Sequence, residues 1–276
     1  MKHRLAEKRA IVTGAGSGLG RALCLELAGR GWRVGVADVD AGRITETAEL
    51  VRRRGGQALG IGCDVTRPQD LDKAAVTVQN AWGGVDLVVN NAGVSAYGDM
   101  ETIPMERWRW IIDINLMGVI HGCRSFIPLL ERQGGGHIIN IASYLAFLAA
   151  PGSACYNVTK AGILSLSETL RIELAGKNIG VSVVMPSFFQ TNLMDQLFCT
   201  DSSKEKMIRT LFSRSTVPAS KIAARVLAAM EKNRLYVLPQ WDARLLWGIK
   251  RWMPGLYMKL FSFLYRKQII NRILGV

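Results

Sequence analysis

The sequence predicts one α/β domain in which helices cover both faces of a parallel, doubly wound sheet of seven strands. Short apolar runs alternate with longer amphipathic helical patterns up to about residue 240. The turn after the first apolar run is rich in glycine, which suits a strand that passes directly into a helix. With 276 residues, of which 49% are hydrophobic, the chain is long enough to bury a full core. A basic, aromatic and helical extension is expected over residues 241–276.

Seven apolar runs predict the strands, and helical patterns predict the connections between them. The strands are expected within residues 10–14, 32–38, 57–65, 86–90, 136–142, 180–186 and 235–239. The helices are expected within residues 21–31, 41–54, 68–82, 105–131, 156–174 and 218–232. The segment between the sixth strand and the last of these helices is expected to be irregular.

The glycine-rich turn is typical of a dinucleotide-binding fingerprint. Its spacing is TGxxxGxG, with Gly14, Gly18 and Gly20 at the fixed positions. Glycines let the backbone approach a pyrophosphate, and the N-terminus of the following helix supplies N–H donors. Because glycine clusters also mark ordinary turns, the prediction of nucleotide binding depends on the flanking strand, helix and acid.

The acid is Asp38, at the end of the second predicted strand. A carboxylate there can accept hydrogen bonds from a ribose 2′-hydroxyl and repels a 2′-phosphate. The loop offers Ser17 rather than a basic residue, so NAD is favoured over NADP. The alternative interpretation of Asp38 is a cap for the helix that begins near Ala41.

Tyr156 and Lys160 lie four residues apart on a predicted helix, so their side chains share one face. A neighbouring ammonium favours phenolate and lowers the pKa of a tyrosine, which suits general acid–base chemistry. Ser143 follows the apolar run HIINIA, and ligands of open α/β sheets bind at the carboxyl ends of strands. A packed ring beside a solvated amine is the alternative interpretation of this pair.

Two polar groups accompany these motifs. The strand DLVVN leads into NNAG, where Asn91, Ala92 and Gly93 either line a ligand site or form a turn. Asn115 lies within the apolar run WRWIIDINLMGVI, and a buried amide requires partners, which neighbouring backbone groups can also supply.

Together these motifs resemble the short-chain dehydrogenase/reductase family in its single-domain form. The resemblance covers roughly residues 8–240 and follows the family's order and spacing. It implies a Rossmann-like fold and hydride transfer between a nicotinamide and a carbinol or carbonyl carbon. The matching segments are TGAGSGLG (Thr13 to Gly20), Asp38, CDV with Asp64 and Val65, NNAG (Asn90 to Gly93), Asn115, Ser143 and YNVTK (Tyr156 to Lys160).

The resemblance implies a role for each matching residue. Tyr156 would exchange the hydroxyl proton, and Lys160 would lower the tyrosine pKa and hold the nicotinamide ribose. Ser143 would hydrogen-bond the substrate oxygen, and Asn115 would anchor a water that relays protons. The implied cofactor contacts are Gly14, Ser17, Gly18, Leu19, Gly20, Asp38, Asp64, Val65, Asn91, Ala92, Gly93 and Thr191, besides Tyr156 and Lys160.

One departure from the family pattern follows the sixth strand. Pro186 precedes Ser187 where the family usually has Pro-Gly, so we expect the extra side chain to narrow or redirect the nicotinamide pocket. Residues 188–215 correspond to the family's variable substrate lobe, within the domain formed by residues 1–240. Their phenylalanines, leucines and methionines favour a lid over an apolar ligand, or else packing against the helix from Pro218.

Composition excludes several classes of site. The five cysteines are scattered and lack metal-ligand spacing, so we expect reduced thiols, no metal site and a cytoplasmic protein. No secretory signal and no spanning helix are expected. The formal net charge is +13, but no nucleic-acid readout module accompanies it.

Much of the positive charge lies in the C-terminal extension. Residues 234–276 hold eight Lys or Arg against one acid. At about 100° per residue, Leu245, Ile249, Trp252 and Met253 share one helical face, with basic residues on the other. This pattern favours peripheral attachment to an anionic membrane surface, or else packing across a subunit interface.

We therefore expect an NAD-dependent alcohol dehydrogenase or carbonyl reductase for an apolar substrate of the lipid, steroid, retinoid or aromatic type. The alternatives are an NADPH-dependent 3-oxoacyl thioester reductase and a non-catalytic, nucleotide-sensing protein. The resemblance further implies a homodimer or homotetramer through the helices that carry Asn115 and Tyr156.

Overall fold

The computed structural model describes residues 5–213 and 215–267. Its centre is a seven-stranded sheet in which every strand pairs in parallel, in the order β3-β2-β1-β4-β6-β7-β9. This confirms the predicted sheet. The strands are β1 (Arg9–Thr13), β2 (Arg33–Asp38), β3 (Gln57–Gly62), β4 (Leu87–Asn90), β6 (Gly136–Ile141), β7 (Ile179–Val184) and β9 (Tyr236–Val237).

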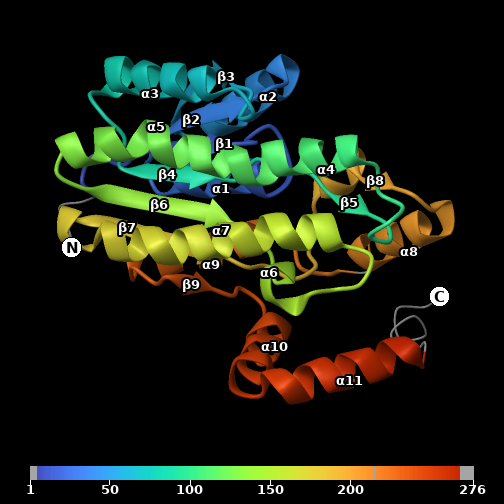
Figure 1. The fold of residues 1–276 in the computed structure, drawn as a ribbon. Helices are drawn as coiled ribbons and strands as arrows, with labels where there is room; N and C mark the ends of the chain where they lie inside the picture. The colour runs from blue at the N-terminus through green and yellow to red at the C-terminus, as the bar shows by residue number, and fades with distance from the viewer. Residues whose placement is uncertain (1–4, 214, 268–276) are drawn as a thin grey trace.

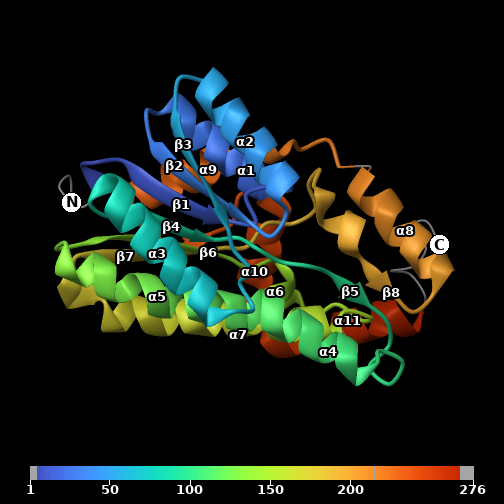
Figure 2. The same ribbon diagram turned by 90° about the horizontal axis from the view of Figure 1, so that it is seen from above.

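Helices cover both faces of the sheet, as Figures 1 and 2 show. Each face has its own hydrophobic cluster, because strands buried on both sides carry apolar residues at successive positions. The helices of one face are α1 (Gly18–Gly29), α2 (Ala41–Arg53) and α9 (Ala219–Glu231). The helices of the other face are α3 (Pro68–Trp82), α5 (Gly118–Arg132) and α7 (Ala154–Glu173).

The direction of winding reverses beside β1. The chain passes from β1 outward to β2 and β3, then crosses back so that β4 lies on the other side of β1. Loops that leave β1 and β4 therefore diverge at their carboxyl ends, and such a switch point is where open α/β sheets bind ligands. The topology thus fixes one edge of the sheet as the place for a site.

The helix predicted over residues 105–131 is present, but its middle is not α-helical. It consists of α4 (Met105–Ile112), a π-helical segment over Asp113–Met117, and α5. Insertions of this kind interrupt the regular hydrogen bonding and often occur at functional sites. Asn115 lies inside the π-helical segment and is fully buried.

The segment expected to be irregular contains regular structure, so that prediction was wrong. It includes the short strand β8 (Phe198–Cys199) and the helix α8 (Ser202–Ser213). β8 pairs in parallel with β5 (Ala96–Tyr97), which follows the loop after β4. This pairing joins residues about 100 positions apart, and its two-residue strands are too short to leave a periodic pattern in the sequence.

The C-terminal extension folds back onto the domain. Its helices α10 (Trp241–Trp252) and α11 (Pro254–Arg266) lie against α6 (Leu145–Leu148), which directly follows the loop after β6. The Tyr257 hydroxyl donates to the Leu148 carbonyl at 2.7 Å, and the Phe147 and Trp247 rings meet edge to face. Residues 268–276 of the predicted extension, with Arg272, lie outside the described residues. None of the described helices is long and apolar enough to cross a bilayer.

Candidate active site

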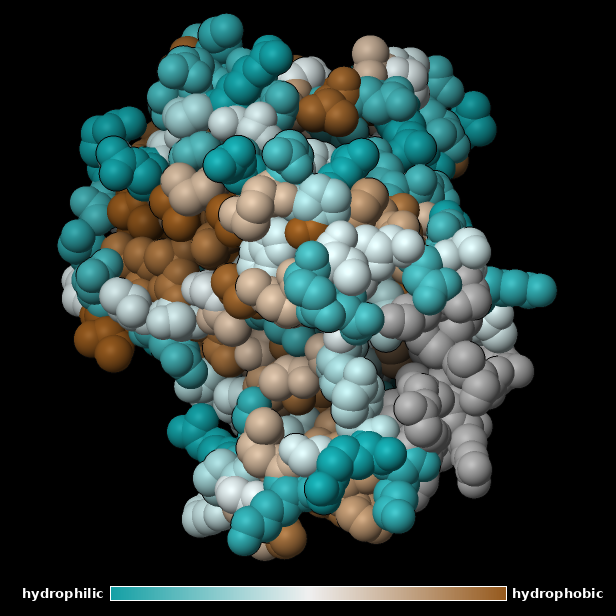
Figure 3. All heavy atoms as spheres, turned by 45° about the vertical axis from the view of Figure 1, so that its right-hand side comes forward, coloured by the Kyte–Doolittle hydropathy of each residue, from teal (hydrophilic) through white to brown (hydrophobic). Residues whose placement is uncertain are grey.

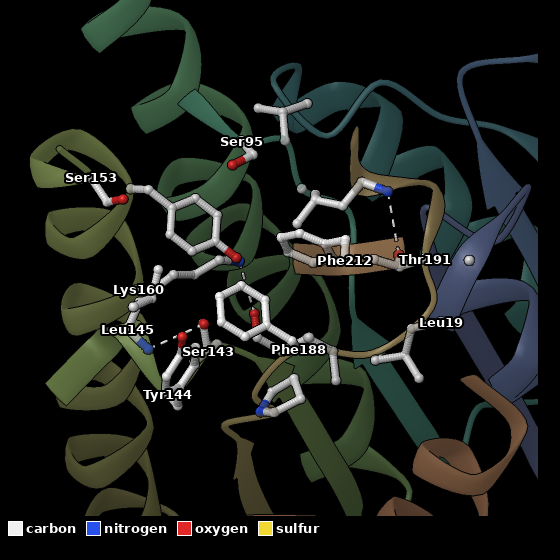
Figure 4. Close-up of a pocket in the computed structure, with 18 of the residues that line it drawn as sticks. Leu19, Ser95, Ser143, Tyr144, Leu145, Ser153, Lys160, Phe188, Thr191 and Phe212 are labelled. Carbon is white, nitrogen blue, oxygen red and sulfur yellow. Dashed lines mark hydrogen bonds between the residues drawn. The ribbon is translucent and has the colours of Figure 1, made fainter. Parts of the chain in front are cut away.

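A cavity of about 800 Å³ opens at the carboxyl ends of β1, β4 and β6. One half of its wall comes from the glycine-rich loop and the ends of β2 and β3. The other half comes from the loop after β6, α7, the lobe that contains α8, and α11. Figure 4 shows Ser143 and Lys160 facing Phe188 and Phe212 across this space. The cavity thus joins the predicted nucleotide site to the predicted catalytic residues.

The glycine-rich loop depends on backbone conformations that glycine adopts without strain. Gly14 and Gly18 have φ values of 61° and 51°, in the left-handed region. Gly20 serves a different purpose, since a Cβ at this position would lie 2.1 Å from the Gly14 carbonyl oxygen. Gly20 therefore lets α1 start directly against the loop, although it does not line the cavity.

The NNAG loop after β4 is tied to β1 by side-chain hydrogen bonds. The Asn91 amide donates to the carbonyl oxygens of Thr13, at 2.9 Å, and Gly14, at 3.1 Å. The Thr13 hydroxyl oxygen accepts from the backbone N–H groups of Asn91 and Ala92. Asn91 thus braces the glycine-rich loop, as well as lining the cavity.

Asp38 lies at the end of β2, and its carboxylate faces the glycine-rich loop. One oxygen accepts from the Gly16 N–H at 2.8 Å, and the other accepts from the Asp40 N–H at 3.1 Å. The cap of α2 is Asp40, which accepts from Arg43, so Asp38 is not the cap that the alternative interpretation required. The carboxylate lines the cavity and retains lone pairs for a ribose hydroxyl.

Ser143, Tyr156 and Lys160 meet at the end of β6. Tyr156 and Lys160 lie on one face of α7, with the Lys160 Nζ 5.5 Å from the centre of the Tyr156 ring. The Lys160 Nζ also donates to the Ile141 carbonyl at 3.1 Å, which ties α7 to the last residue of β6. The Ser143 hydroxyl oxygen accepts from the Leu145 N–H, so the turn into α6 fixes its position.

Burial controls the protonation of this pair. Removal from water raises the pKa of Tyr156 to about 12, although a hydrogen bond with Ser143 acts in the opposite direction. Burial also lowers the pKa of Lys160 to about 8. The expected lowering of the tyrosine pKa is therefore not found in the protein by itself, while Lys160 stays largely protonated at neutral pH. The proton lost near pH 8 is therefore that of Lys160, while Tyr156 keeps its proton well above this pH.

Asn115 lies behind the catalytic residues and does not line the cavity. Its amide donates to the Val94 carbonyl at 2.9 Å and to the Thr159 hydroxyl, while its oxygen accepts from the Val94 N–H at 2.8 Å. These bonds match the interpretation in which backbone groups satisfy the amide. Asn115 connects the NNAG loop to α7 next to Lys160.

Aromatic and aliphatic side chains form the substrate half of the cavity. Phe188 makes edge-to-face contacts with Tyr144 and with Phe212 of α8. Further apolar residues of this half come from the loop after β6, the lobe and the C-terminal extension, and they include Leu145, Leu148, Phe189, Leu193, Ile208, Leu246, Phe261 and Leu264. The apolar residues of the lobe therefore face a cavity, rather than only packing against α9.

Ser187, the departure from the family pattern, is built into the cavity wall. It is buried, and its N–H donates to the Gln240 side chain, which in turn donates to the Phe188 carbonyl. These bonds connect the loop after β7 to the start of α10. Thr191 follows at the cavity wall, and its hydroxyl lies close to Gly18.

The cavity gathers the predicted site residues apart from Gly20 and Asn115. Sequence reasoning missed two contributors. Arg43 of α2 lies beside Asp38 at the nucleotide end, and Phe261, Leu264 and Tyr265 of α11 close the substrate end. The residue pattern of the C-terminal extension predicted an amphipathic helix, but it did not predict that this extension would line the cavity. No group of three potential metal ligands occurs among residues 5–213 and 215–267.

Comparisons with known proteins agree with this geometry. Residues 8–202 match the family described as short chain dehydrogenase. A crystal structure of a short-chain dehydrogenase/reductase from Burkholderia phymatum in complex with NAD superimposes with a TM-score of 0.83 at 30% identity, over 88% of this chain and 94% of that one. The chain therefore belongs to the short-chain dehydrogenase/reductase family, whose fold binds a nucleotide and supports oxidoreductase chemistry.

Two relatives share about a third of their aligned residues with this chain. The 1-deoxy-11-beta-hydroxypentalenate dehydrogenase of Streptomyces exfoliatus is 33% identical over 87% of this chain and 86% of its own length. The probable oxidoreductase EphD of Mycobacterium tuberculosis is 31% identical over 88% of this chain, which spans only 43% of EphD.

The burial of Lys160 generates a prediction about stability. At neutral pH folding buries a charged ammonium, so the Lys160→Met variant should raise the free energy of unfolding of the nucleotide-free protein by roughly 1–2 kcal/mol. The gain should be full below pH about 8 and fade towards 10.5, where lysine is neutral in both states. Chemical denaturation measures it, with the exposed Lys177→Met as control. A loss of stability in the Lys160 variant would show that the ammonium serves the fold.

Proposed function

We propose that the protein is an NAD-dependent oxidoreductase that interconverts an alcohol and its ketone or aldehyde on an apolar substrate. The observation that carries this proposal is the single cavity in which Ser143, Tyr156 and Lys160 face an apolar chamber, while Asp38 and the glycine-rich loop form the opposite wall. The residues of that wall fit a nicotinamide dinucleotide, because they combine a strain-free glycine turn, a helix N-terminus and a carboxylate. Such a cofactor, when bound, supplies the hydride acceptor or donor.

Residues of the chain itself carry out the proton transfers. In alcohol oxidation the substrate hydroxyl gives its proton to the Tyr156 phenolate as its carbon loses a hydride. In reduction the protonated Tyr156 returns that proton to the carbonyl oxygen. Ser143 lies close enough to hydrogen-bond with Tyr156, and its hydroxyl can donate to the substrate oxygen. The ammonium of Lys160 stabilises negative charge that develops on the phenol. Asn115 acts indirectly in this scheme, by holding the NNAG loop against α7.

The surroundings of Asp38 support NAD. A 2′-phosphate would approach a carboxylate that already accepts two backbone N–H groups and so cannot turn away easily. Arg43 lies nearby and offsets part of this repulsion, but it is engaged with Asp40 at 3.6 Å. The Burkholderia relative was crystallised with NAD.

The exposed apolar side chains of α7 support the proposal that the protein forms a homo-oligomer. Val158 and Ile172 are solvent-exposed on this helix, and Figure 3 shows a broad hydrophobic area at the height of α5 and α7. A homodimer or homotetramer that buries these helices would cover it. The five cysteines are free thiols, which is consistent with the cytoplasm as the compartment.

A substrate panel with both nucleotides tests the proposed function. Short, long-chain and polycyclic alcohols and ketones should show turnover with NAD or NADH, and kcat/KM should rise with apolar size. A 3-oxoacyl thioester as the preferred substrate, with NADPH, would replace the proposal by a reductase of that class. Nucleotide binding without any turnover would indicate a sensing protein.

Nucleotide choice should depend on Asp38 in particular. Wild-type protein should bind NAD at least about tenfold more tightly than NADP, and Asp38→Ser should narrow this ratio because the repulsive carboxylate is gone. Titration calorimetry with both nucleotides measures the effect. Glu49→Gln is the control, since it removes an exposed acid of α2 that pairs with Arg53 and does not line the cavity. An unchanged ratio in the Asp38 variant would contradict the assignment.

The protonation of the pair predicts a pH dependence with opposite signs for the two directions. Carbonyl reduction needs the proton on Tyr156, which a pKa of about 12 retains, and also the ammonium of Lys160, which is lost near pH 8, so its kcat/KM should fall as pH rises through about 8. Alcohol oxidation needs the phenolate, whose fraction grows with pH up to about 12, so its kcat/KM should rise over the same range. Ser143→Ala should displace the rise in alcohol oxidation to higher pH, because the hydrogen bond that lowers the pKa of Tyr156 is lost. Flat profiles between pH 6 and 10 would contradict the assignment.

A further inference from the structure

The outer face of α10 is apolar and exposed to solvent. Trp241, Leu245 and Trp252 are 75%, 55% and 85% exposed, and they lie at spacings of four and seven residues, which places them on one side of the helix. The opposite side contacts the domain through the buried Ala243, through the Trp247 ring against Phe147 and through the Lys250 ammonium, which donates to the Phe147 carbonyl. The helix is therefore packed on one side and presents two tryptophans to solvent on the other.

Helix α11 continues this apolar surface. Leu256, Leu260 and Phe263 are about half exposed on its outer flank, while Tyr257 is buried against α6. Figure 3 shows hydrophobic and hydrophilic side chains side by side along the lower edge of the molecule, where α10 and α11 lie. We refer to Trp241, Leu245, Trp252, Leu256, Leu260 and Phe263 as the tail surface.

Positive charge surrounds the tail surface. Arg244, Arg251, Lys259 and Arg266 are exposed on α10 and α11, and Asp242 is the acid of these helices. In the part of the chain that the structure describes, none of these four cations forms an ion pair with an acidic side chain. Exposed tryptophans flanked by unneutralised cations are the combination that favours an anionic lipid interface.

The tail surface is also close to the substrate chamber. Phe261, Leu264 and Tyr265 line the cavity from the inner side of α11, whereas Leu260 and Phe263 face outward on the same helix. One helix, about 10 Å across, thus separates the chamber from whatever contacts the outer flank.

We propose that the tail surface lies on an anionic bilayer and that the apolar substrate enters the chamber from that bilayer past α11. The second half of this inference rests on the proposed function. A second copy of the chain fits the surface less well, because a two-fold interface would set this basic patch against itself. A bilayer with anionic headgroups neutralises the cations and also dissolves the class of substrate that the chamber accommodates.

The test uses the full chain and vesicles of phosphatidylcholine, with or without an equal part of phosphatidylglycerol. Wild-type protein should co-sediment with the anionic vesicles at low salt. The double variant Trp241→Ser, Trp252→Ser should bind these vesicles with an affinity at least about tenfold lower. Lys259→Glu with Arg266→Glu should lose binding to anionic vesicles as well. Val76→Ser is the matched control, since Val76 is an exposed apolar residue on α3, away from the tail.

Activity distinguishes the two halves of the inference. The tryptophan double variant should keep wild-type kcat/KM for a short, water-soluble alcohol, while its KM for a long-chain alcohol held in anionic vesicles should rise several-fold. Equal vesicle binding by wild type and variant, or none by either, would overturn the docking, and a tail-dependent dimer in light scattering would replace it by self-association. Vesicle binding without turnover of any alcohol would leave the docking intact and refute the proposed function and the entry route.

Discussion

The buried ammonium of Lys160 is the constraint on which the site depends. Its Nζ donates to the Ile141 carbonyl and lies beside the Tyr156 ring, so one group fixes α7 against the end of β6 and sets the charge around the phenol. Keeping a cation where burial lowers its pKa to about 8 is costly for folding, and a neutral amine could equally donate the hydrogen bond to Ile141. A buried ammonium can stabilise the negative charge that develops on the phenol during proton transfer. This catalytic role explains why the fold retains a cation whose burial is unfavourable for stability.

The topology of the sheet places that pair opposite a nucleotide. Winding reverses at β1, so the glycine-rich loop and the NNAG loop diverge and leave a cavity at the carboxyl edge. Asn91 and Thr13 hold the two loops together, and Asn115 connects the second loop to α7. Membership in the family indicates that the fold supports oxidoreductase chemistry. These hydrogen bonds explain how segments that are distant in the sequence are held in fixed positions around the cavity.

Local patterns predicted most of the sheet and the site. The strands, the glycine turn and the YxxxK pair each depend on residues close together in the sequence, where periodicity and spacing are informative. The pairing of β5 with β8 and the return of α11 to the cavity depend on contacts across 100 residues or more, which leave no such pattern. The direction of the pKa shift of Tyr156 was misjudged for a related reason, since spacing shows that two groups are adjacent but not how deeply both are buried.

The most direct test removes only the phenol oxygen. The Tyr156→Phe variant keeps the ring and its packing, so NAD affinity should change by less than about threefold, while kcat/KM for alcohol oxidation should fall by roughly 10³. Nucleotide titration and initial rates on the same preparation supply both numbers. Retention of more than about a tenth of the activity would show that another group exchanges the proton, and the account of the site would then be wrong.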